Sequence, residues 1–379
     1  YHIYNDQGQY YNPQYRGTDT DGKYIVEEGY STDLTTDHAL SFIEHRDASK
    51  PFCLLLHHKA PHRNWLANTK YFGMYDNVTF PMPETFYDDY ETRGSAVRTQ
   101  KMSVTKDMRW EQDFKVPEML DTANADSWDS YLSLMNEVNR MNPEQRIAWG
   151  KYYFPRNRRL LEARLTGKEL DEWKYQNYIR DYMSVIKSVD ESVGRVLDYL
   201  DCHGLTDNTI IVYTSDQGFY MGEHGWFDKR FMYEESLRTP LLIAYPGHIQ
   251  PGSVCNKLVQ NIDYAPTFLD LAGISKPKEL PGRSLTPLFK AGDKVKGWRN
   301  SIYYHYYDYP TYHMVRKHEG VRTDRYKLIH FYGAGGLDAV KENKYQHQPG
   351  TREYNCMTYL NSLGYFEPKD SAVNYNELY

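Results

Sequence analysis

The stretch I-I-V-Y-T-S-D-Q-G, residues 210–218, says most about the fold of this 379-residue chain. Its first three residues, Ile210 to Val212, are β-branched, and Tyr213 follows them, so the composition predicts a strand. The polar residues 214–217 come directly after that strand. Open parallel sheets bind ligands just beyond the carboxyl ends of their strands, so we expect a functional site here.

Helices and strands alternate on both sides of this stretch. Apolar residues keep to one stripe between Tyr178 and Leu200, and Gly204 is placed to end that helix. Residues 31–47 predict an earlier helix behind a Ser/Thr/Asp capping signature, and the apolar run 52–56 after it is typical of a strand buried on both faces. A strand at 240–245 and a helix near Pro266 continue the alternation to about residue 290. This pattern predicts the α/β class.

Two regions depart from the alternation. Residues 80–159 mix charged and aromatic residues with prolines such as Pro81, Pro83 and Pro117, which indicates a long insertion with some helix. Beyond Gly297, the tyrosine-rich residues 301–309 and the residues 320–331 predict antiparallel strands of a small second unit. We therefore expect a core domain over residues 1–296, with an insertion at about 80–160, and a C-terminal α+β subdomain over 297–379.

Composition limits the classes of partner. The net charge of -6, with both signs interspersed, gives no basic stripe for a nucleic acid. No stretch approaches the roughly 18 apolar residues of a membrane span, so we expect no membrane partner. The chain starts at Tyr1 without a signal-peptide pattern, and we expect the natural N-terminus to lie upstream, where a secretion signal would be lost with it.

The cysteines give no sign of a redox or metal motif. They are far apart and form no C-x-x-C pair: Cys53, Cys202, Cys255 and Cys356. Structural or free thiols are the expected outcome.

Candidate ligands for a hard cation stand at the end of the central strand. Asp216 and Gln217 offer a carboxylate and an amide oxygen, both of which Ca²⁺ accepts readily, whereas glutamine is a poor ligand for zinc. The alternative is an aspartate that only starts a turn before Gly218. The glycine-rich loop 218–230 follows and contains Lys229, which is either a solvated surface lysine or a cation that neutralises a sulfate oxygen. His224 in this loop is a packed histidine or a substrate contact.

Three histidines crowd the segment after the first apolar run. His57, His58 and His62 share the loop 57–65, which ends at Trp65. Imidazole ligands of transition metals usually come from separate elements, so a zinc-type site is disfavoured.

These motifs together resemble the sulfatase family. T-S-D-Q-G-F-Y-M-G-E-H-G-W-F-D-K-R at 214–230 is similar to the sulfatase signature, and K-A-P-H-R-N-W at 59–65 is similar to the lysine-proline-histidine loop of that family. Further matches follow in the same order along the chain, at 237–240, 263–273 and 281–288. The resemblance implies an alkaline-phosphatase/sulfatase-like sheet flanked by helices. It also implies that Asp216 and Gln217 are the second pair of calcium ligands, and that His62 and Lys229 hold the sulfate and assist its departure.

The resemblance also shows what this sequence lacks. Sulfatases of this type convert a cysteine to a formylglycine nucleophile, and no cysteine or serine here starts the C-x-P/A-S-R motif required. The first pair of metal-binding aspartates is missing as well. Asp88 and Asp89 are adjacent acids, but they follow His62 and are expected to be surface charges. We expect the N-terminal part of the fold, with the nucleophile, to lie upstream of this chain, which alone would be inactive and bind calcium weakly.

The C-terminal part indicates the substrate. Residues 303–332 resemble the C-terminal subdomain of bacterial sulfatases that attack sulfated glycans, and N-acetylglucosamine-6-sulfatases are the nearest group. This implies a 6-O-sulfated N-acetylglucosamine substrate, glycosaminoglycan or mucin degradation, and a periplasmic or secreted enzyme. His305, His313 and His318 are candidates to contact sugar hydroxyls, although each could be structural.

Three alternatives stay open. An iduronate-2-sulfatase-like or other glycosaminoglycan sulfatase shares the scaffold. A phosphatase or phosphodiesterase shares the fold but would need a histidine beside Asp216 to hold zinc, where this chain has Gln217. A non-catalytic glycan-binding pseudo-sulfatase fits the absent nucleophile. For the enzyme, we expect Asp216 and Gln217 at the C-terminal edge of a parallel strand, with Lys229 and His62 converging on one pocket.

Overall fold

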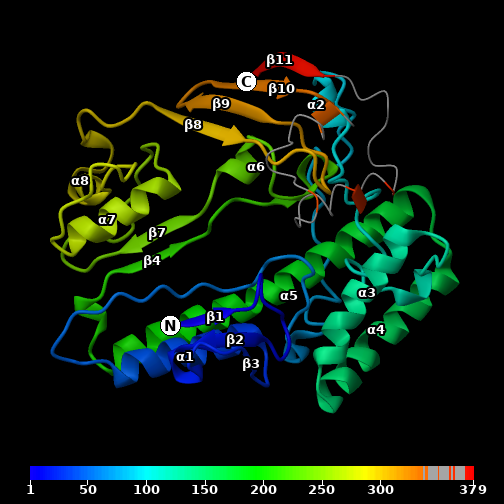
Figure 1. The fold of residues 1–379 in the computed structure, drawn as a ribbon, viewed down its shortest axis with the longest axis horizontal. Helices are drawn as coiled ribbons and strands as arrows, with labels where there is room; N and C mark the ends of the chain where they lie inside the picture. Colours follow the sequence, from blue (N-terminus) through cyan, green and yellow to red (C-terminus); the bar gives the residue numbers. More distant parts are fainter. Residues whose placement is uncertain (336–337, 340–348, 350–357, 360–361, 363–371) are drawn as a thin grey trace. The chain divides into compact units, whose positions relative to one another are not determined.

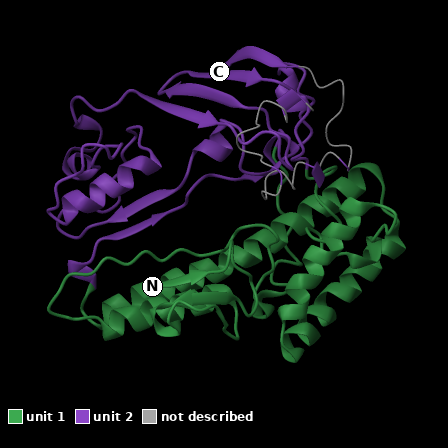
Figure 2. Ribbon diagram, viewed as in Figure 1, with its two compact units in different colours: residues 1–83, 104–205 green, residues 84–103, 206–379 purple. Residues whose placement is uncertain are grey.

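The computed structural model describes residues 1–335, 338–339, 349, 358–359, 362 and 372–379, and Cys356 lies outside them. The chain forms two compact units, coloured separately in Figure 2. The first unit contains residues 1–83 and 104–205, and the second contains residues 84–103 and 206–379. The segment 84–103 therefore belongs to a different unit from the residues on either side of it. The expected domain boundary after residue 296 stays a prediction.

The first unit is mainly helical (Figure 1). A small antiparallel sheet, in the order β1-β2-β3, precedes helix α1, which packs along the long helix α5. The strands are β1 (His2–Tyr4), β2 (Gln14–Gly17) and β3 (Ile25–Val26), and the helices are α1 (Ser31–His45), α3 (Ala125–Arg140), α4 (Pro143–Ala163) and α5 (Gly167–Cys202). Helices α3 and α4 confirm that the insertion contains helix.

Helix α5 confirms the predicted helix and extends it by about three turns at its start. Gly204, with φ +63°, follows the last turn, and the Leu205 N–H bonds to the Leu200 carbonyl at 2.8 Å, as in a Schellman motif. The added turns contain buried polar side chains, such as Gln176, which exchanges hydrogen bonds with the backbone of Phe80. Because these residues are polar, the apolar stripe did not reveal them.

The predicted helix at 31–47 is confirmed by α1, but its expected cap is not made. Tyr30 occupies the N-cap position and no side chain caps the helix. Tyr30 instead donates its hydroxyl to the Leu66 carbonyl at 2.9 Å in the core. A buried tyrosine anchor thus stands where the sequence suggested a polar cap.

Two strand predictions need correction. Residues 52–56 form no strand, since no described strand of the first unit pairs with them. Leu55 in this run is 63% exposed and is therefore not buried on both faces. Strand β4 (Ile211–Thr214) exists as predicted, but it pairs antiparallel with β7 (Leu241–Ala244) instead of lying in a parallel sheet. Among the described residues, these two strands form a two-stranded sheet with each other alone, and they run in opposite directions.

The second unit contains a four-stranded antiparallel sheet in the order β11-β10-β9-β8, which confirms the antiparallel prediction beyond residue 297 (Figure 1). Its strands are β8 (Ser301–Tyr306), β9 (His318–Thr323), β10 (Lys327–Gly333) and β11 (Val373–Leu378). The shorter elements are α2 (Ser95–Arg98), β5 (Tyr220–Met221), β6 (Phe227–Asp228), α6 (Glu234–Leu237), α7 (Tyr264–Leu271) and α8 (Thr286–Ala291).

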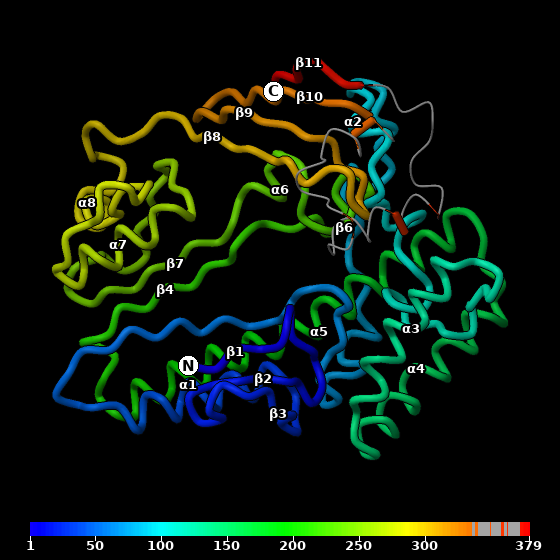
Figure 3. Tube along the Cα trace, in the orientation of Figure 1, coloured from blue at the N-terminus to red at the C-terminus, as the bar shows by residue number. Residues whose placement is uncertain are grey.

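The core of this unit lies between the sheet and the loops after β5 and β6. Ile329, Phe331 and Val373 of the sheet cluster with Trp226 and Phe231, all at most 5% exposed. Helix α2 lies beside β11 (Figure 3), where the Ala96 N–H donates to the Tyr375 hydroxyl at 2.9 Å. No helix within the described residues has both the length and the apolar character needed to cross a membrane.

Candidate active site

Lys229 follows directly after strand β6 in the second unit, and its side chain is half-buried. Burial lowers the pKa of the Lys229 ammonium, and the Asp216 carboxylate partly offsets this. The lysine at the end of the glycine-rich loop therefore interacts with the aspartate at the end of β4.

The backbone around Lys229 is fixed from several sides. The Ser236 hydroxyl donates to the Lys229 carbonyl at 2.5 Å, and the Gly218 N–H donates to the Ser236 carbonyl at 2.8 Å. Gly218 cannot be replaced cheaply, since a Cβ there would lie 2.1 Å from the Glu235 carbonyl oxygen. Leaving a buried backbone N–H or carbonyl unpaired costs free energy, so these hydrogen bonds are kept and fix the backbone position of Lys229.

Asp216 and Gln217 lie next to each other beyond the end of β4. The Asp216 side chain is exposed, and its backbone carbonyl accepts a hydrogen bond from Asn261 at 2.5 Å. Carboxylate and amide oxygens suit calcium, which takes six to eight ligands, so this pair fits part of such a site. Among the described residues no group of three or more His, Cys, Asp or Glu side chains could hold a metal ion.

Two residues that the sequence did not single out lie beside the lysine. Asp228 and Arg230 form an ion pair, and the Nε2 atom of His313 is 3.7 Å from the Asp228 carboxylate. His313 is 8% exposed, and its Nδ1 atom lies 2.9 Å from the Lys101 carbonyl. Asp228 and Arg230 adjoin Lys229 in the chain, and the His313 imidazole lies near the Asp228 carboxylate. The available signal for Asp228 and Arg230 was their position, one residue to either side of the lysine.

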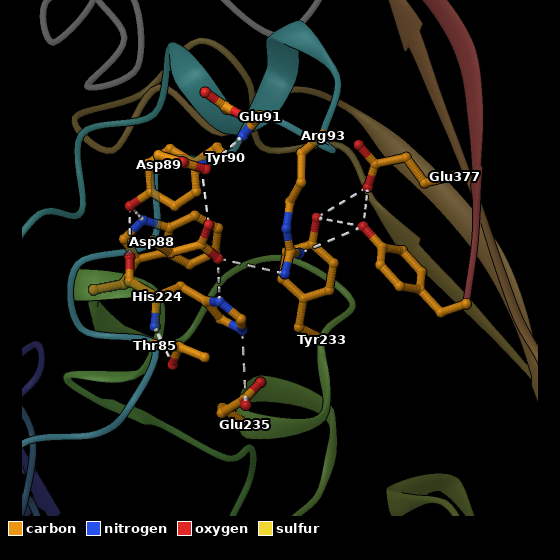
Figure 4. A network of polar contacts seen from close by, with 12 residues as sticks. Thr85, Asp88, Asp89, Tyr90, Glu91, Arg93, His224, Tyr233, Glu235 and Glu377 are labelled. Atoms are coloured by element: carbon orange, nitrogen blue, oxygen red, sulfur yellow. Dashed lines mark hydrogen bonds and ion pairs between the residues drawn. The ribbon is translucent and has the colours of Figure 1, made fainter.

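His224 is held by the segment 84–103 (Figure 4). Its Nδ1 atom lies 2.9 Å from Asp88 Oδ2, and its Nε2 atom lies 3.9 Å from Glu235 Oε1. The expected surface role is wrong for Asp88, whose side chain is only 20% exposed because His224 and Arg93 pack against it. Asp89 is exposed, as expected.

His62 lies in the first unit, on a loop tied to the insertion. Its Nδ1 atom lies 2.8 Å from the Arg63 carbonyl, which can only accept, so Nδ1 carries the proton and Nε2 has the lone pair of the neutral ring. The Tyr10 hydroxyl donates to the His62 carbonyl at 2.5 Å. Arg63 donates to both carboxylate oxygens of buried Asp113, at 2.6 and 2.5 Å.

The other histidines have separate environments. His58 is half-buried against Ser192, and burial lowers its pKa to about 4. His305 is exposed on β8, with its Nε2 atom 2.5 Å from the Tyr332 hydroxyl. His318 is fully buried between aromatic rings, and burial lowers its pKa to about 4 as well. The structure thus leaves His305 open to a ligand and encloses His318.

The predicted site residues are divided between the units. Asp216, Gln217, His224, Lys229, His305 and His313 belong to the second unit, and His62 belongs to the first. That His62 and Lys229 converge on one pocket stays a prediction.

Comparison with known proteins gives the family. The sulfatase family model matches residues 2–274, and the model of the N-sulphoglucosamine sulphohydrolase C-terminal region matches residues 222–349. The N-acetylglucosamine-6-O-sulfatase of Bacteroides thetaiotaomicron is 46% identical over 355 residues, which cover 92% of this chain and 61% of that protein. A multifunctional alkaline phosphatase superfamily protein, PehA of Trinickia caryophylli, is 27% identical over 319 residues, covering 81% of this chain and 52% of that protein.

A solved structure gives the same result for the fold. It shows a protein in complex with its substrate D-glucosamine-2-N,6-O-disulfate; it is 43% identical, with a TM-score of 0.81, and the match covers 95% of this chain and 74% of that one. The chain spans 61% and 52% of the length of the two relatives named above. With its alkaline-phosphatase-like α/β fold, this chain belongs to the sulfatase family.

Proposed function

We propose that this chain belongs to an enzyme that hydrolyses sulfate esters of glycans, with 6-O-sulfated N-acetylglucosamine as the substrate. The observation that carries the proposal is the half-buried Lys229, which interacts with Asp216 and stands in the chain between the ion-paired residues Asp228 and Arg230. The 46% identical relative named as an N-acetylglucosamine-6-O-sulfatase supports the sugar. The structural relative in complex with a glucosamine disulfate supports it as well.

Lys229 would bind a sulfate oxygen through its ammonium group. Burial strengthens this interaction because little water competes, while Asp216 favours the charged form of the lysine. As the S–O bond to the sugar breaks, negative charge grows on the oxygens, and a fixed cation is worth most at that stage.

His62 would act on the oxygen that leaves with the sugar. The hydrogen bond from Nδ1 to the Arg63 carbonyl fixes the ring, so the Nε2 atom is the one that can exchange a proton. In the imidazolium form Nε2 donates to the departing oxygen, and the neutral ring remains. This role requires His62 and Lys229 to face the same substrate.

Calcium and the nucleophile complete the proposal. Asp216 and Gln217 would hold part of a Ca²⁺ ion, which when bound supplies positive charge to the sulfate oxygens. The formylglycine motif does not occur in residues 1–379, so a formylglycine would have to come from outside them.

Asp228, Arg230 and His313 would recognise the sugar. Hydroxyl groups both donate and accept, so a carboxylate beside a guanidinium and an imidazole can bind two neighbouring hydroxyls. His305 and His224 remain predicted substrate contacts, and His224 has fewer open positions because both its ring nitrogens face carboxylates.

We also propose a periplasmic or secreted enzyme. This proposal rests on the resemblance of residues 303–332 to the C-terminal subdomain of bacterial sulfatases that attack sulfated glycans. Cell fractionation followed by immunodetection tests this, and a signal confined to the cytoplasm would contradict it.

The function is tested with the full-length protein and N-acetylglucosamine-6-sulfate as substrate, measuring sulfate release with and without calcium. We expect turnover that Lys229→Ala reduces far more in kcat than in KM, while Lys278→Ala, at an exposed lysine of the same unit, leaves it unchanged. Faster release from a 2-sulfated iduronate would favour the glycosaminoglycan alternative, and preference for a phosphate monoester would favour a phosphatase. Binding of the sulfated sugar without turnover by the full-length protein would favour the pseudo-sulfatase.

A further inference from the structure

Segment 84–103 contacts the loop before Lys229 at its backbone as well as its side chain. The His224 N–H donates to the Thr85 hydroxyl at 3.0 Å, and the His224 carbonyl accepts from the Tyr90 hydroxyl at 2.5 Å. The Asp88 carboxylate binds the His224 ring at 2.9 Å (Figure 4). Every polar group of this one residue is therefore in contact with an acceptor, a donor or a carboxylate.

The contacts continue on the rest of the turn. Trp226 donates its indole N–H to the Tyr90 hydroxyl at 2.6 Å. At Gly225 a Cβ would lie 2.7 Å from the Phe86 carbonyl oxygen, so the backbones touch here. The Phe227 N–H donates to the Met102 carbonyl at 2.9 Å. The segment thus follows the turn from residue 224 to residue 227, two residues before the lysine.

This turn has a conformation that needs support. His224 has φ +57°, in the left-handed region that residues other than glycine seldom adopt. Glycines on both sides, Gly222 and Gly225, also have positive φ. Such a backbone persists when surrounding contacts fix it, and the Thr85, Asp88 and Tyr90 contacts add to the hydrogen bonds that the turn forms within its own backbone.

Asp88 is itself fixed by charge. Its carboxylate accepts from the Tyr90 N–H at 2.9 Å and pairs with Arg93 at 3.6 Å. The pKa of Asp88 lies below its usual value: burial works against ionisation, but the Tyr90 amide, His224 and Arg93 outweigh it. Asp88 thus remains a carboxylate across the range in which an enzyme works.

We infer that Asp88 and Tyr90 are positioning residues that hold the 222–228 turn, and through it place Lys229 for sulfate transfer. The catalytic consequence of this inference rests on the proposed function. The hydrogen bonds by which Asp88 and Tyr90 hold the turn, called the brace below, lie within the second unit and do not depend on that function. Strand β6 transmits the constraint, since it contains Phe227 and Asp228 and ends immediately before the lysine.

The test compares three variants of the full-length protein. Asp88→Ala removes the partner of the imidazole, and Tyr90→Phe removes only the hydroxyl between His224 and Trp226. Asp89→Asn is the matched control, because Asp89 is the adjacent acid, is exposed, and accepts a hydrogen bond from the Glu91 N–H at 2.9 Å within this segment.

Amide hydrogen exchange over residues 222–228 is measured first, and it needs no substrate. We expect exchange to become about ten-fold faster in Asp88→Ala and Tyr90→Phe and to stay unchanged in Asp89→Asn, since each of the first two variants removes hydrogen bonds of the turn. Unchanged exchange in both Asp88→Ala and Tyr90→Phe, or equal acceleration in Asp89→Asn, would show that Asp88 and Tyr90 do not hold the turn.

Sulfate release is measured second. A reacting group displaced by a fraction of an ångström loses rate more than binding, so we expect kcat to fall about ten-fold with KM nearly constant. Faster exchange with kcat unchanged would overturn the positioning role. If the unmodified protein releases no sulfate from any tested sugar, the proposed function fails, and the exchange result still decides whether the brace exists.

Discussion

Lys115 offers a sharp test of what holds the first unit together. Its side chain is fully buried, and its Nζ atom lies 2.8 Å from Asp181 Oδ2 and 2.9 Å from the Asp113 carbonyl. Burial lowers the pKa of Lys115, with Asp181 acting in the opposite direction. Replacing this lysine with methionine keeps the volume and removes the charge.

The expected loss of unfolding free energy depends on which partners the Asp181 carboxylate keeps. Breaking a buried ion pair by removing one partner costs about 3–5 kcal/mol, because the other charge stays buried. In Lys115→Met, Asp181 would keep Tyr153 Oη at 3.4 Å and Arg156 Nη1 at 3.9 Å, both longer than the lost contact. These partners place the expected loss of unfolding free energy near the lower end of the range, at about 3 kcal/mol.

Urea denaturation followed by far-ultraviolet circular dichroism measures this, because the long helices α3, α4 and α5 lie in the first unit. Lys187→Met on the same helix as Asp181 is the control: Lys187 pairs with Asp190 at 2.6 Å in an exposed position and should show no change. In the double variant Lys115→Met with Asp181→Leu, we expect most of the lost stability to return. A loss below about 1 kcal/mol for the single variant, or no recovery in the double variant, would refute this account of the pair.

Other perturbations act on the candidate site and on pH dependence. His313→Ala should raise KM for the sulfated sugar more than it lowers kcat, as expected of a group that contacts hydroxyls; an unchanged KM would assign His313 to packing. Asp216→Asn should abolish the calcium dependence of sulfate release and weaken calcium binding in calorimetry, and retained binding would remove Asp216 from the metal site. The pKa of His318 falls from 6.5 to about 4 on folding because of burial. The free energy of unfolding that depends on a neutral His318 is therefore fully present above pH 6.5 and is lost as pH falls from 6.5 toward 4. In urea denaturation at several pH values, His318→Phe should flatten this acid dependence by up to about 3 kcal/mol, and an unaltered slope would contradict the shift.

Residue patterns in the sequence identified those helices and strands that can be predicted from their own residues alone. The helix from Tyr178 to Leu200 was found because apolar periodicity records which side of a helix is buried, and the strand at 210–213 was found from its β-branched composition. The direction of strand pairing was not found. Residues 52–56 and β4 have the composition of buried parallel strands, but pairing depends on which strands lie beside them, and this information is not local.

For the candidate site, sequence motifs identified the residues with distinctive chemistry and missed those identified by contact alone. Asp216, Gln217 and Lys229 stand out by their neighbours along the chain. Asp88 did not, because an adjacent pair of acids is usually solvated, and only the distance to His224 separates it from Asp89.

The region at about 80–160, expected to be an insertion, contacts both loops that contain the predicted catalytic residues. Within the second unit, residues 84–103 hold the turn that leads to Lys229, through Asp88 and Tyr90. Within the first unit, Asp113 holds Arg63, the residue after His62, and the Gln112 side chain donates to Asn64 at 2.7 Å. Each loop therefore depends on a neighbouring stretch of the same insertion. Positioned groups lose rate steeply when displaced, so substitutions of Asp88, Tyr90 or Asp113, which hold these loops, should lower turnover.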